Sequence, residues 1–234
     1  MKSGTPFPIK DLIFFKQGIY NLHESETHEY ELLLRCEAEG LCAFPSQLFY
    51  KIMTDERIHK LYIDHIEELL NDYFEQDQNI YCLNLDYQEL FYEETLVFLK
   101  KFKYKDRLKI EFTERIPVRR NNAYEELVPV NIIKAVKQMG YSIALDDFLS
   151  GVNTFETLYA LDELISRVKI SWVGFKRILP SKEAHKLLFS LAHIISELGK
   201  EVVIEGVEEQ ALLDSFPKEW KQQSYYYELP RKIK

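Results

Sequence analysis

The chain has 234 residues, of which 46% are apolar and 14% aromatic, and its formal net charge is -8 at pH 7. This composition supports a sizeable hydrophobic core and argues against a disordered chain. The negative net charge argues against nonspecific binding of duplex nucleic acid, which requires a basic surface. It leaves room for a small phosphate ligand that a few basic groups and metal ions would hold.

The number and spacing of the cysteines and the lengths of the apolar runs indicate the cellular compartment of the protein. Cys36, Cys42 and Cys82 are an odd number without a Cys-x-x-Cys pair, which argues against a disulfide framework or a zinc knuckle. The first residues lack the apolar stretch of a secretory signal peptide. No run approaches the ~20 apolar residues that span a bilayer. We therefore expect a soluble, cytoplasmic protein without a membrane partner.

Short apolar runs alternate with longer amphipathic ones along the chain. Short runs bounded by polar residues predict strands buried on both faces, and a helical repeat in the longer runs predicts helices. We expect strands over residues 12–20, 30–35, 80–85, 108–113, 141–146, 167–172, 201–205 and 224–227. We expect helices from residue 45 to about 75, with a break near 54–55, and over 87–102, 128–139, 154–165, 182–198 and 208–214.

This order of elements indicates an α/β fold. Eight strands with intervening helices in one chain favour a TIM-like (β/α)8 barrel. The polar stretch 21–29 is short enough for a hairpin, so one strand near the N-terminus should run antiparallel to the rest. No Ser/Gly/Pro-rich linker divides the chain, and we expect a single domain over residues 1–234. An open doubly wound sheet is the structural alternative.

Polar side chains recur at the carboxyl ends of the predicted strands. These ends meet at one rim of an α/β barrel. The rim would gather one lysine, one asparagine and five carboxylates: Glu31, Asn84, Glu111, Asp146, Asp147, Lys169 and Glu205. Each acid alone has an ordinary interpretation as a helix cap or a solvated loop residue. Their recurrence after successive strands favours one shared site.

Such a site calls for protonation or for bound cations. Two carboxylates ~5 Å apart repel by about 3 kcal/mol at an effective dielectric constant of ~20. Oxygen ligands without His or Cys favour Mg²⁺ or Mn²⁺ over Zn²⁺. Two such ions would nearly balance five carboxylates, and ion pairs of this kind activate water for attack on a phosphodiester. Lys169 would hold that water or the developing negative charge.

The rim residues resemble the motifs of the EAL domain family, the bacterial cyclic di-GMP phosphodiesterases. The resemblance covers nearly the whole chain, and the segments follow the family's order. They are Glu31-Leu32-Leu33 for Glu-Ala-Leu, Leu83-Asn84-Leu85, Glu111-Phe112-Thr113-Glu114 for Glu-x-Thr-Glu, Asp146-Asp147-Phe148, Lys169-Ile170, Glu205-Gly206-Val207-Glu208 and Gln223-Ser224-Tyr225.

The resemblance implies a TIM-like barrel that hydrolyses cyclic di-GMP to linear pGpG with two Mg²⁺ or Mn²⁺ ions. The ligands of one ion would be Glu31, Asn84, Glu111 and Asp146, and those of the other Asp146, Asp147 and Glu205. Lys169 and Glu205 would be catalytic, with Lys169 contacting the attacking water. Glu114 would anchor the loop 147–157. The nucleotide would face Gln17, Arg35 and Gln223. The helix after the loop would support a homodimer.

Departures from the family pattern bear on catalysis. Ser171 stands where the family has the aspartate that follows Lys-Ile, close to the lysine and the reacting water. Leu149 stands where the family prefers glycine, which strains the loop if that position has a positive φ. The complete ligand set favours an active enzyme. Ser171 and the altered loop favour the alternative, a cyclic di-GMP receptor or a protein-interaction regulator without turnover.

Overall fold

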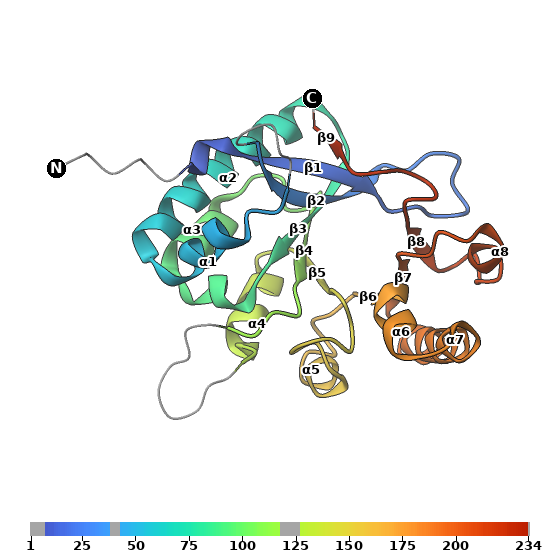
Figure 1. Ribbon diagram of the computed structural model, residues 1–234. Coiled ribbons are helices and arrows are strands. Elements are labelled where there is room, and N and C mark those ends of the chain that lie inside the picture. Colours follow the sequence, from blue (N-terminus) through green and yellow to red (C-terminus); the bar gives the residue numbers. More distant parts are fainter. Residues whose placement is uncertain (1–7, 38–42, 118–126, 234) are drawn as a thin grey trace.

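The computed structural model describes residues 8–37, 43–117 and 127–233 (Figure 1). Residues 1–7, on which the absence of a signal peptide was argued, lie outside the described residues. The strands are β1 (Leu12–Gly18), β2 (Glu29–Cys36), β3 (Ile80–Leu85), β4 (Leu108–Phe112), β5 (Ser142–Leu145), β6 (Arg167–Ser171), β7 (Glu201–Glu205), β8 (Lys221–Gln223) and β9 (Arg231–Lys232). The helices are α1 (Ser46–Thr54), α2 (Glu56–Gln76), α3 (Glu93–Lys101), α4 (Val130–Gln138), α5 (Phe155–Ala160), α6 (Trp172–Ile178), α7 (Ser181–Glu197) and α8 (Gln210–Leu213).

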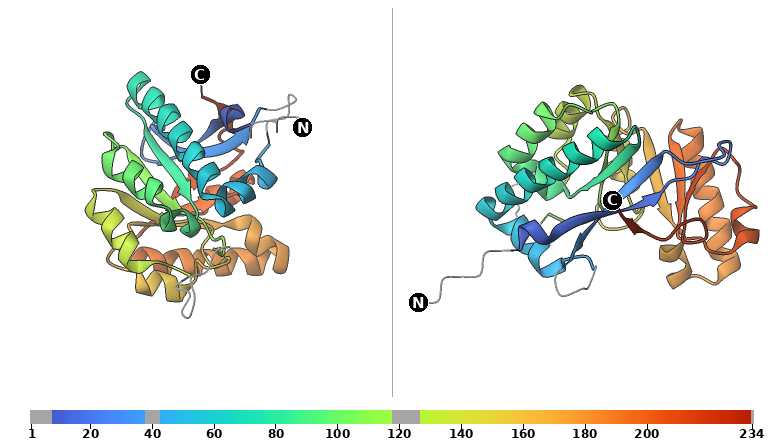
Figure 2. Two further views of the ribbon diagram at one scale, coloured as in Figure 1. Left: turned by 90° about the vertical axis from the view of Figure 1, so that its left-hand side faces the viewer. Right: turned by 90° about the horizontal axis from the view of Figure 1, so that it is seen from above.

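The strands form one curled sheet with the order β8-β7-β6-β5-β4-β3-β2-β1-β9. Strands β2 to β8 pair in parallel, whereas β1 is antiparallel to both β2 and β9. A two-residue bridge between Tyr20 and Gln222 links the segment after β1 to β8, with N···O distances of 2.8 and 3.0 Å. The helices lie outside the curl (Figures 1 and 2). The expected TIM-like α/β architecture with an antiparallel strand near the N-terminus is confirmed.

The sheet has an apolar outer face and a polar inner face. Alternating side chains of each strand point outward and pack against the helices, and they include Leu32, Leu83, Ile110, Ile143, Ile170 and Ile204. The intervening residues point into the barrel, among them Glu31, Glu111 and Lys169. The strands are therefore buried on both faces, as expected, but a two-residue period separates apolar packing from charge.

The structure corrects the sequence expectations mainly in the second half of the chain. The last barrel strand is Lys221–Gln223, and residues 224–227 form a turn instead of the expected strand. The Ser224 hydroxyl accepts from Tyr226 N at 2.9 Å, and Ser224 O accepts from Tyr227 N at 3.2 Å, which closes that turn. Helix α6, which follows β6 directly, was not expected. Helix α5 ends at Ala160 rather than near residue 165.

Among the described residues, no helix combines the length and the apolar character that crossing a bilayer requires.

Candidate active site

The ammonium group of Lys169 lies at the centre of the predicted rim. Lys169 belongs to β6 and is 1% exposed. Its Nζ lies 3.0 Å from Glu31 Oε2, 2.9 Å from Glu111 Oε2, 3.0 Å from Asp146 Oδ1 and 2.8 Å from Glu205 Oε1. These carboxylates come from β2, from β4, from the residue after β5, and from β7. Residues far apart in sequence thus meet around one atom.

Two amides hold Glu31 from another side. Asn84 Nδ2 donates to Glu31 Oε1 at 2.6 Å, and Gln223 Nε2 donates to Glu31 Oε2 at 2.5 Å. Gln223 Nε2 also donates to Gln17 Oε1 at 3.3 Å. Two residues predicted to face the nucleotide, Gln17 and Gln223, therefore belong to the same network as the predicted metal ligands.

Burial and mutual repulsion control the ionisation of this cluster. Burial lowers the pKa of Lys169, but the surrounding carboxylates outweigh it and raise that pKa well above its ordinary value. Burial also raises the pKa of Asp146 well above its usual range, although Lys169 opposes the shift. For Glu205, burial outweighs the opposing effect of Lys169, and the pKa rises to about 7. For Glu31, burial raises the pKa, but Lys169 and the hydrogen bonds from Asn84 and Gln223 have the larger combined effect. The pKa of Glu31 is therefore below its ordinary value.

The two aspartates after β5 begin a tight loop with unusual backbone angles. Asp147 has φ 44° and Leu149 has φ 72°, both in the left-handed region. The sequence expectation that Leu149 is strained is therefore confirmed, at a cost of ~1 kcal/mol for a residue with a Cβ. The loop closes through Leu149 N, which donates to Asn153 O at 2.7 Å. Phe148 N also donates to Lys169 O at 3.0 Å, which joins the loop to β6.

Glu114, the predicted loop anchor, contacts the loop through its backbone. Its carbonyl accepts from Val152 N at 2.9 Å. Gly151, with φ 48°, packs so closely there that an added Cβ would lie 1.9 Å from Glu114 O. The Glu114 carboxylate instead lies with those of Asp146 and Asp147, with ligand oxygens all within 4.8 Å of one another. Burial raises the pKa of Glu114.

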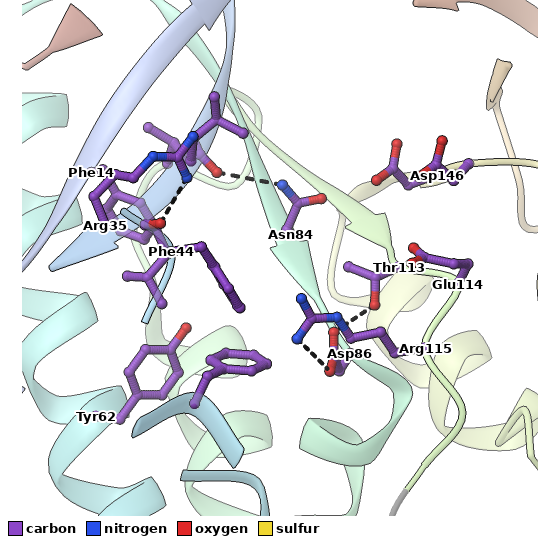
Figure 3. Close-up of a pocket in the computed structure, with 15 residues that line it drawn as sticks. Phe14, Arg35, Phe44, Tyr62, Asn84, Asp86, Thr113, Glu114, Arg115 and Asp146 are labelled. Atoms are coloured by element: carbon purple, nitrogen blue, oxygen red, sulfur yellow. Dashed lines mark hydrogen bonds and ion pairs between the residues drawn. The ribbon is translucent and has the colours of Figure 1, made fainter. Parts of the chain in front are cut away.

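Two cavities open on either side of Asp146 and Asp147, and both aspartates line each of them. One cavity has a volume of about 350 Å³, and its walls include Gln17, Ser171 and Gln223. The other has a volume of about 250 Å³ and carries Arg35 (Figure 3). The remaining walls of this second cavity are aromatic and polar and include Phe14, Phe44, Phe49, Tyr62, Asn84, Asp86 and Arg115. An elongated ligand could therefore occupy both cavities and cross the carboxylates between them.

Asp86 and Arg115 line the second cavity but are not among the residues predicted from the sequence. Arg115 lies over the rings of Phe44 and Phe49, 4.7 and 5.1 Å from their centroids, and 3.9 Å from Asp86 Oδ2. Thr113 Oγ1 donates to Asp86 Oδ1 at 2.5 Å. Asp86 follows Asn84 by two positions, so the two-residue period of a strand could have identified it.

The profile of the EAL domain family matches residues 9–218 of the chain. The chain belongs to the EAL domain family. No curated protein matches its sequence. At 18–21% identity, the solved structures that resemble it support the fold alone.

Three of these solved structures illustrate the likeness. EAL enzyme Bd1971, with cAMP and cyclic di-GMP bound, is 21% identical with a TM-score of 0.73. The PaMucR phosphodiesterase in complex with cyclic di-GMP is 19% identical with a TM-score of 0.73. Klebsiella pneumoniae BlrP1, with manganese and cyclic di-GMP, is 19% identical with a TM-score of 0.74. The match to Bd1971 covers 95% of this chain and 63% of the Bd1971 chain. The corresponding shares are 96% and 93% for PaMucR, and 98% and 58% for BlrP1.

The predicted ligands of this EAL domain suit divalent cations. They offer only oxygen donors, and the side-chain oxygen of Asn84 is buried without a hydrogen-bond partner among the described residues. The carboxylates Glu31, Glu111, Asp146, Asp147 and Glu205, together with Lys169, form what we call the upper layer. Five negative charges against one positive charge leave this layer at a formal −4, which two divalent cations would neutralise.

A second set of charges fills the barrel of this EAL domain below the first, and sequence reasoning missed it. We call it the lower layer: Glu29, Lys109, Arg167, Glu201 and Lys221. Glu29 contacts Lys109 at 2.7 Å, Arg167 at 2.6 Å and Lys221 at 2.7 Å. Glu201 contacts Arg167 at 2.5 Å and Lys221 at 2.8 Å. Counting back two or four residues along each strand from the upper layer and from Gln223 would have found them, because these positions face the same way.

Proposed function

We propose that this EAL domain is a metal-dependent phosphodiesterase that hydrolyses cyclic di-GMP to linear pGpG, in bacterial second-messenger signalling in the cytoplasm. The observation that carries the proposal is the upper layer. Carboxylates from four places in the barrel converge within 3.0 Å of Lys169 Nζ, between two cavities that share Asp146 and Asp147. The cyclic di-GMP complexes of PaMucR and BlrP1 support the ligand class.

The metal site would use the ligands that the sequence predicts. Glu31, Asn84, Glu111 and Asp146 would hold one Mg²⁺ or Mn²⁺ ion, and Asp146, Asp147 and Glu205 would hold the second. Two bound ions of this kind acidify a water molecule and take up charge on phosphate oxygens. The manganese in the BlrP1 complex supports a divalent cation in such a barrel.

The protein's own residues would orient the nucleotide and stabilise charge. Lys169 stays protonated at neutral pH because its pKa is raised, so it can donate to the attacking water or to a developing oxyanion. Gln17 and Gln223 are fixed by their mutual hydrogen bond in the wider cavity, where they would hold one half of the ligand. Arg35 lines the other cavity, where its guanidinium would pair with phosphate.

A turnover assay tests the proposal. Purified protein is incubated with cyclic di-GMP and Mn²⁺ or Mg²⁺, and the products are separated by chromatography. We expect pGpG to form, EDTA to stop the reaction, and Glu111→Gln to lower turnover by at least ~100-fold because a metal ligand is lost. Glu197→Gln is the matched control, because Glu197 is exposed on α7 and pairs only with His193 in the described structure. Full turnover in Glu111→Gln, or no product from wild-type protein that binds the nucleotide, would reject the proposal.

A cyclic di-GMP receptor without turnover is the second candidate, and Ser171 favours it. Ser171 pairs with Glu205 across β6 and β7 and lines the wider cavity. If the absent carboxylate limits catalysis, Ser171→Asp should raise turnover by ~10-fold or more, as partners of metal-bound groups do. Calorimetric affinity for the nucleotide should change little. An unchanged rate would show that this serine is not what limits turnover.

We also propose that a homodimer forms through helix α5. Phe155 and Tyr159 on this helix are 47% and 87% exposed, and Leu149 in the preceding loop is 42% exposed. Exposed large apolar side chains that lie close together in sequence are typical of interaction surfaces. Sedimentation should give twice the chain mass for the wild type and the chain mass for Tyr159→Glu. A monomeric wild type at all concentrations would contradict the dimer.

A further inference from the structure

Asn153 is a buried amide in the loop that follows the two aspartates. Its Nδ2 donates to Phe112 O at 2.8 Å and to Asp146 O at 2.6 Å. Its Oδ1 accepts from the Tyr87 hydroxyl at 2.8 Å. An amide side chain offers two N–H donors and one oxygen, and all three are engaged here.

The three partners of Asn153 stand at the ends of three neighbouring strands. Tyr87 follows Asn84 of β3 by three positions, and Phe112 follows Glu111 of β4 directly. Asp146 comes immediately after β5 and is itself a predicted ligand. The Phe112 carbonyl also accepts from Asp146 N at 3.0 Å, so one oxygen joins β4, β5 and the loop. One side chain therefore ties together the strand ends that present Asn84, Glu111 and Asp146.

Tyr87 is a rigid partner for this amide. It is fully buried in the short 3-10 turn Tyr87–Phe91, and its ring stacks on Phe112 with centroids 5.0 Å apart and planes 13° apart. Burial raises the pKa of the Tyr87 phenol, so the hydroxyl remains a donor. A buried donor that lost this bond would carry a desolvation cost, which disfavours movement of either residue.

Asn153 also closes the strained part of the loop. Its carbonyl accepts from Leu149 N at 2.7 Å, and its own N–H donates to Ser150 O at 2.9 Å. Asp147 and Leu149 have φ values of 44° and 72°. Backbone strain persists only where the surroundings fix it, and the Asn153 contacts supply that constraint.

We propose that Asn153 is a positioning residue for the divalent-metal site: with Tyr87 as its fixed partner, it sets the spacing of Asn84, Glu111 and Asp146. The inference rests on the proposed function for the identity of the ions. Metal–ligand distances tolerate shifts of only ~0.2 Å, so a looser junction between these strand ends should weaken metal binding.

The test compares two buried tyrosines that each donate one hydrogen bond. Tyr87→Phe removes the donor to Asn153 and leaves the packing of the ring. Tyr141→Phe is the matched control, because the buried Tyr141 hydroxyl donates to Leu99 O at 2.7 Å, outside the site. Mn²⁺ affinity is measured by calorimetry and the melting temperature by scanning calorimetry. Both variants should lose similar stability, whereas Tyr87→Phe alone should bind Mn²⁺ ~10-fold more weakly.

A second variant, Asn153→Asp, should weaken Mn²⁺ binding more than Tyr87→Phe does. Asn153→Asp places carboxylate oxygens against two backbone carbonyls and should weaken Mn²⁺ binding by up to ~100-fold, the upper end for groups that orient metal ligands. Hydrogen exchange should rise across residues 146–153 in both site variants and stay unchanged in Tyr141→Phe. If Asn153→Asp does not fold, Tyr87→Phe decides the question.

The outcomes separate the two proposals. Equal Mn²⁺ affinity in wild type, Tyr87→Phe and Tyr141→Phe would overturn the role of Asn153 and leave the proposed function intact. A wild-type protein that binds no Mn²⁺ would overturn the proposed function, and the role of Asn153 with it. Weaker Mn²⁺ binding in Tyr87→Phe at the melting temperature of the control supports the inference.

Discussion

The upper and lower layers inside the barrel both consist of acidic and basic side chains, and β2, β4, β6 and β7 contribute to each, yet their charge balance differs. In the lower layer, Glu29 and Glu201 face three cations, a formal charge of +1. Burial raises the pKa of Glu29, but Arg167, Lys109 and Lys221 outweigh it and hold that pKa far below its usual range. In the upper layer, Lys169 contacts four of the five carboxylates, and the pKa values of Asp146 and Glu205 are raised.

The difference in charge balance distinguishes the residues that stabilise the fold from those that form the candidate site. A buried ion cluster is tolerable when each charge has a partner, and the lower layer satisfies this condition within the chain. The upper layer satisfies it only partly, and the missing positive charge matches that of two divalent ions. We infer that the lower layer stabilises the barrel. The upper layer keeps an excess of negative charge, which lowers the stability of the metal-free protein and which bound cations would neutralise.

The largest expected effect is in the lower layer. Glu29→Gln removes the carboxylate that contacts Lys109, Arg167 and Lys221. Among the described residues Lys109 then lacks an ion-pair partner, whereas Arg167 and Lys221 keep only Glu201 of the lower layer. We expect the free energy of unfolding to fall by about 3–5 kcal/mol, the usual cost of breaking a buried ion pair. Urea unfolding measures it, and added Mn²⁺ should not restore the loss. A change below ~1 kcal/mol would mean that the lower layer is not what stabilises the barrel.

The second effect tests Lys169 as the internal counter-ion of the upper layer. In EDTA, Lys169→Met should lower the free energy of unfolding by about 3 kcal/mol, because four carboxylates lose their shared partner. One fixed free Mn²⁺ concentration, ~100 times the wild-type dissociation constant, is used for both proteins, and it should add about 2.7 kcal/mol to the wild type. The gain with Mn²⁺ should be larger in Lys169→Met than in wild type, since the site has become more negative. Equal gains would contradict the idea that lysine and metal balance the same carboxylates.

The sequence predicted the upper layer well because two simple regularities act together. Side chains alternate along a strand, and the carboxyl ends of parallel strands share a rim, so Glu111 and Lys169 could be placed together without coordinates. The lower layer obeys the same alternation. It was missed because Glu29 and Lys221 lie outside the strands predicted over 30–35 and 224–227, although the structure places them at the start of β2 and β8. Arg167 and Glu201 are the first residues of their predicted strands, far from the carboxyl ends where a site was expected.

Other features were beyond sequence reasoning for physical reasons. Strand β8 has three residues, too few for a pattern, and the adjacent aromatic run Tyr225–Tyr227 suggested a strand where a Ser224 turn forms. Helix α6 has only seven residues, and its N-cap residue Ser171 makes no capping hydrogen bond with its side chain. The partners of Asn153 are two backbone carbonyls and a tyrosine hydroxyl, and only tertiary structure brings these groups to one side chain.

A third effect concerns a buried ionisable group outside both layers. His59 on α2 stacks on Tyr92 with ring centroids 4.1 Å apart, and its Nε2 lies 2.8 Å from Thr95 Oγ1. Burial lowers its pKa from 6.5 to about 3. Between these two values the unfolded chain binds a proton that the folded chain excludes, so stability falls as the pH falls.

The expected loss through His59 is about 2 kcal/mol between pH 7.5 and pH 5, from the 1.36 kcal/mol that each pKa unit represents. Urea unfolding at both pH values measures it, with His59→Gln as the comparison because it lacks the titrating ring. The wild type should lose ~2 kcal/mol more than the variant over this range. A parallel pH dependence in both proteins would mean that His59 is not buried in its neutral form.

The smallest effect has the opposite sign to the first and tests the comparison of the layers most directly. Asp146→Asn replaces a carboxyl group whose pKa is raised, most of all by burial and further by repulsion from Glu205, Glu31 and Glu111, although Lys169 opposes the shift. In EDTA the variant should therefore be more stable than the wild type by about 1 kcal/mol, since like-charge repulsion is relieved while the amide keeps the shape of the side chain. With Mn²⁺ in excess the order should reverse, because only the wild type offers the full ligand set. A variant that is less stable under both conditions would show that the upper layer, like the lower one, is balanced within the chain.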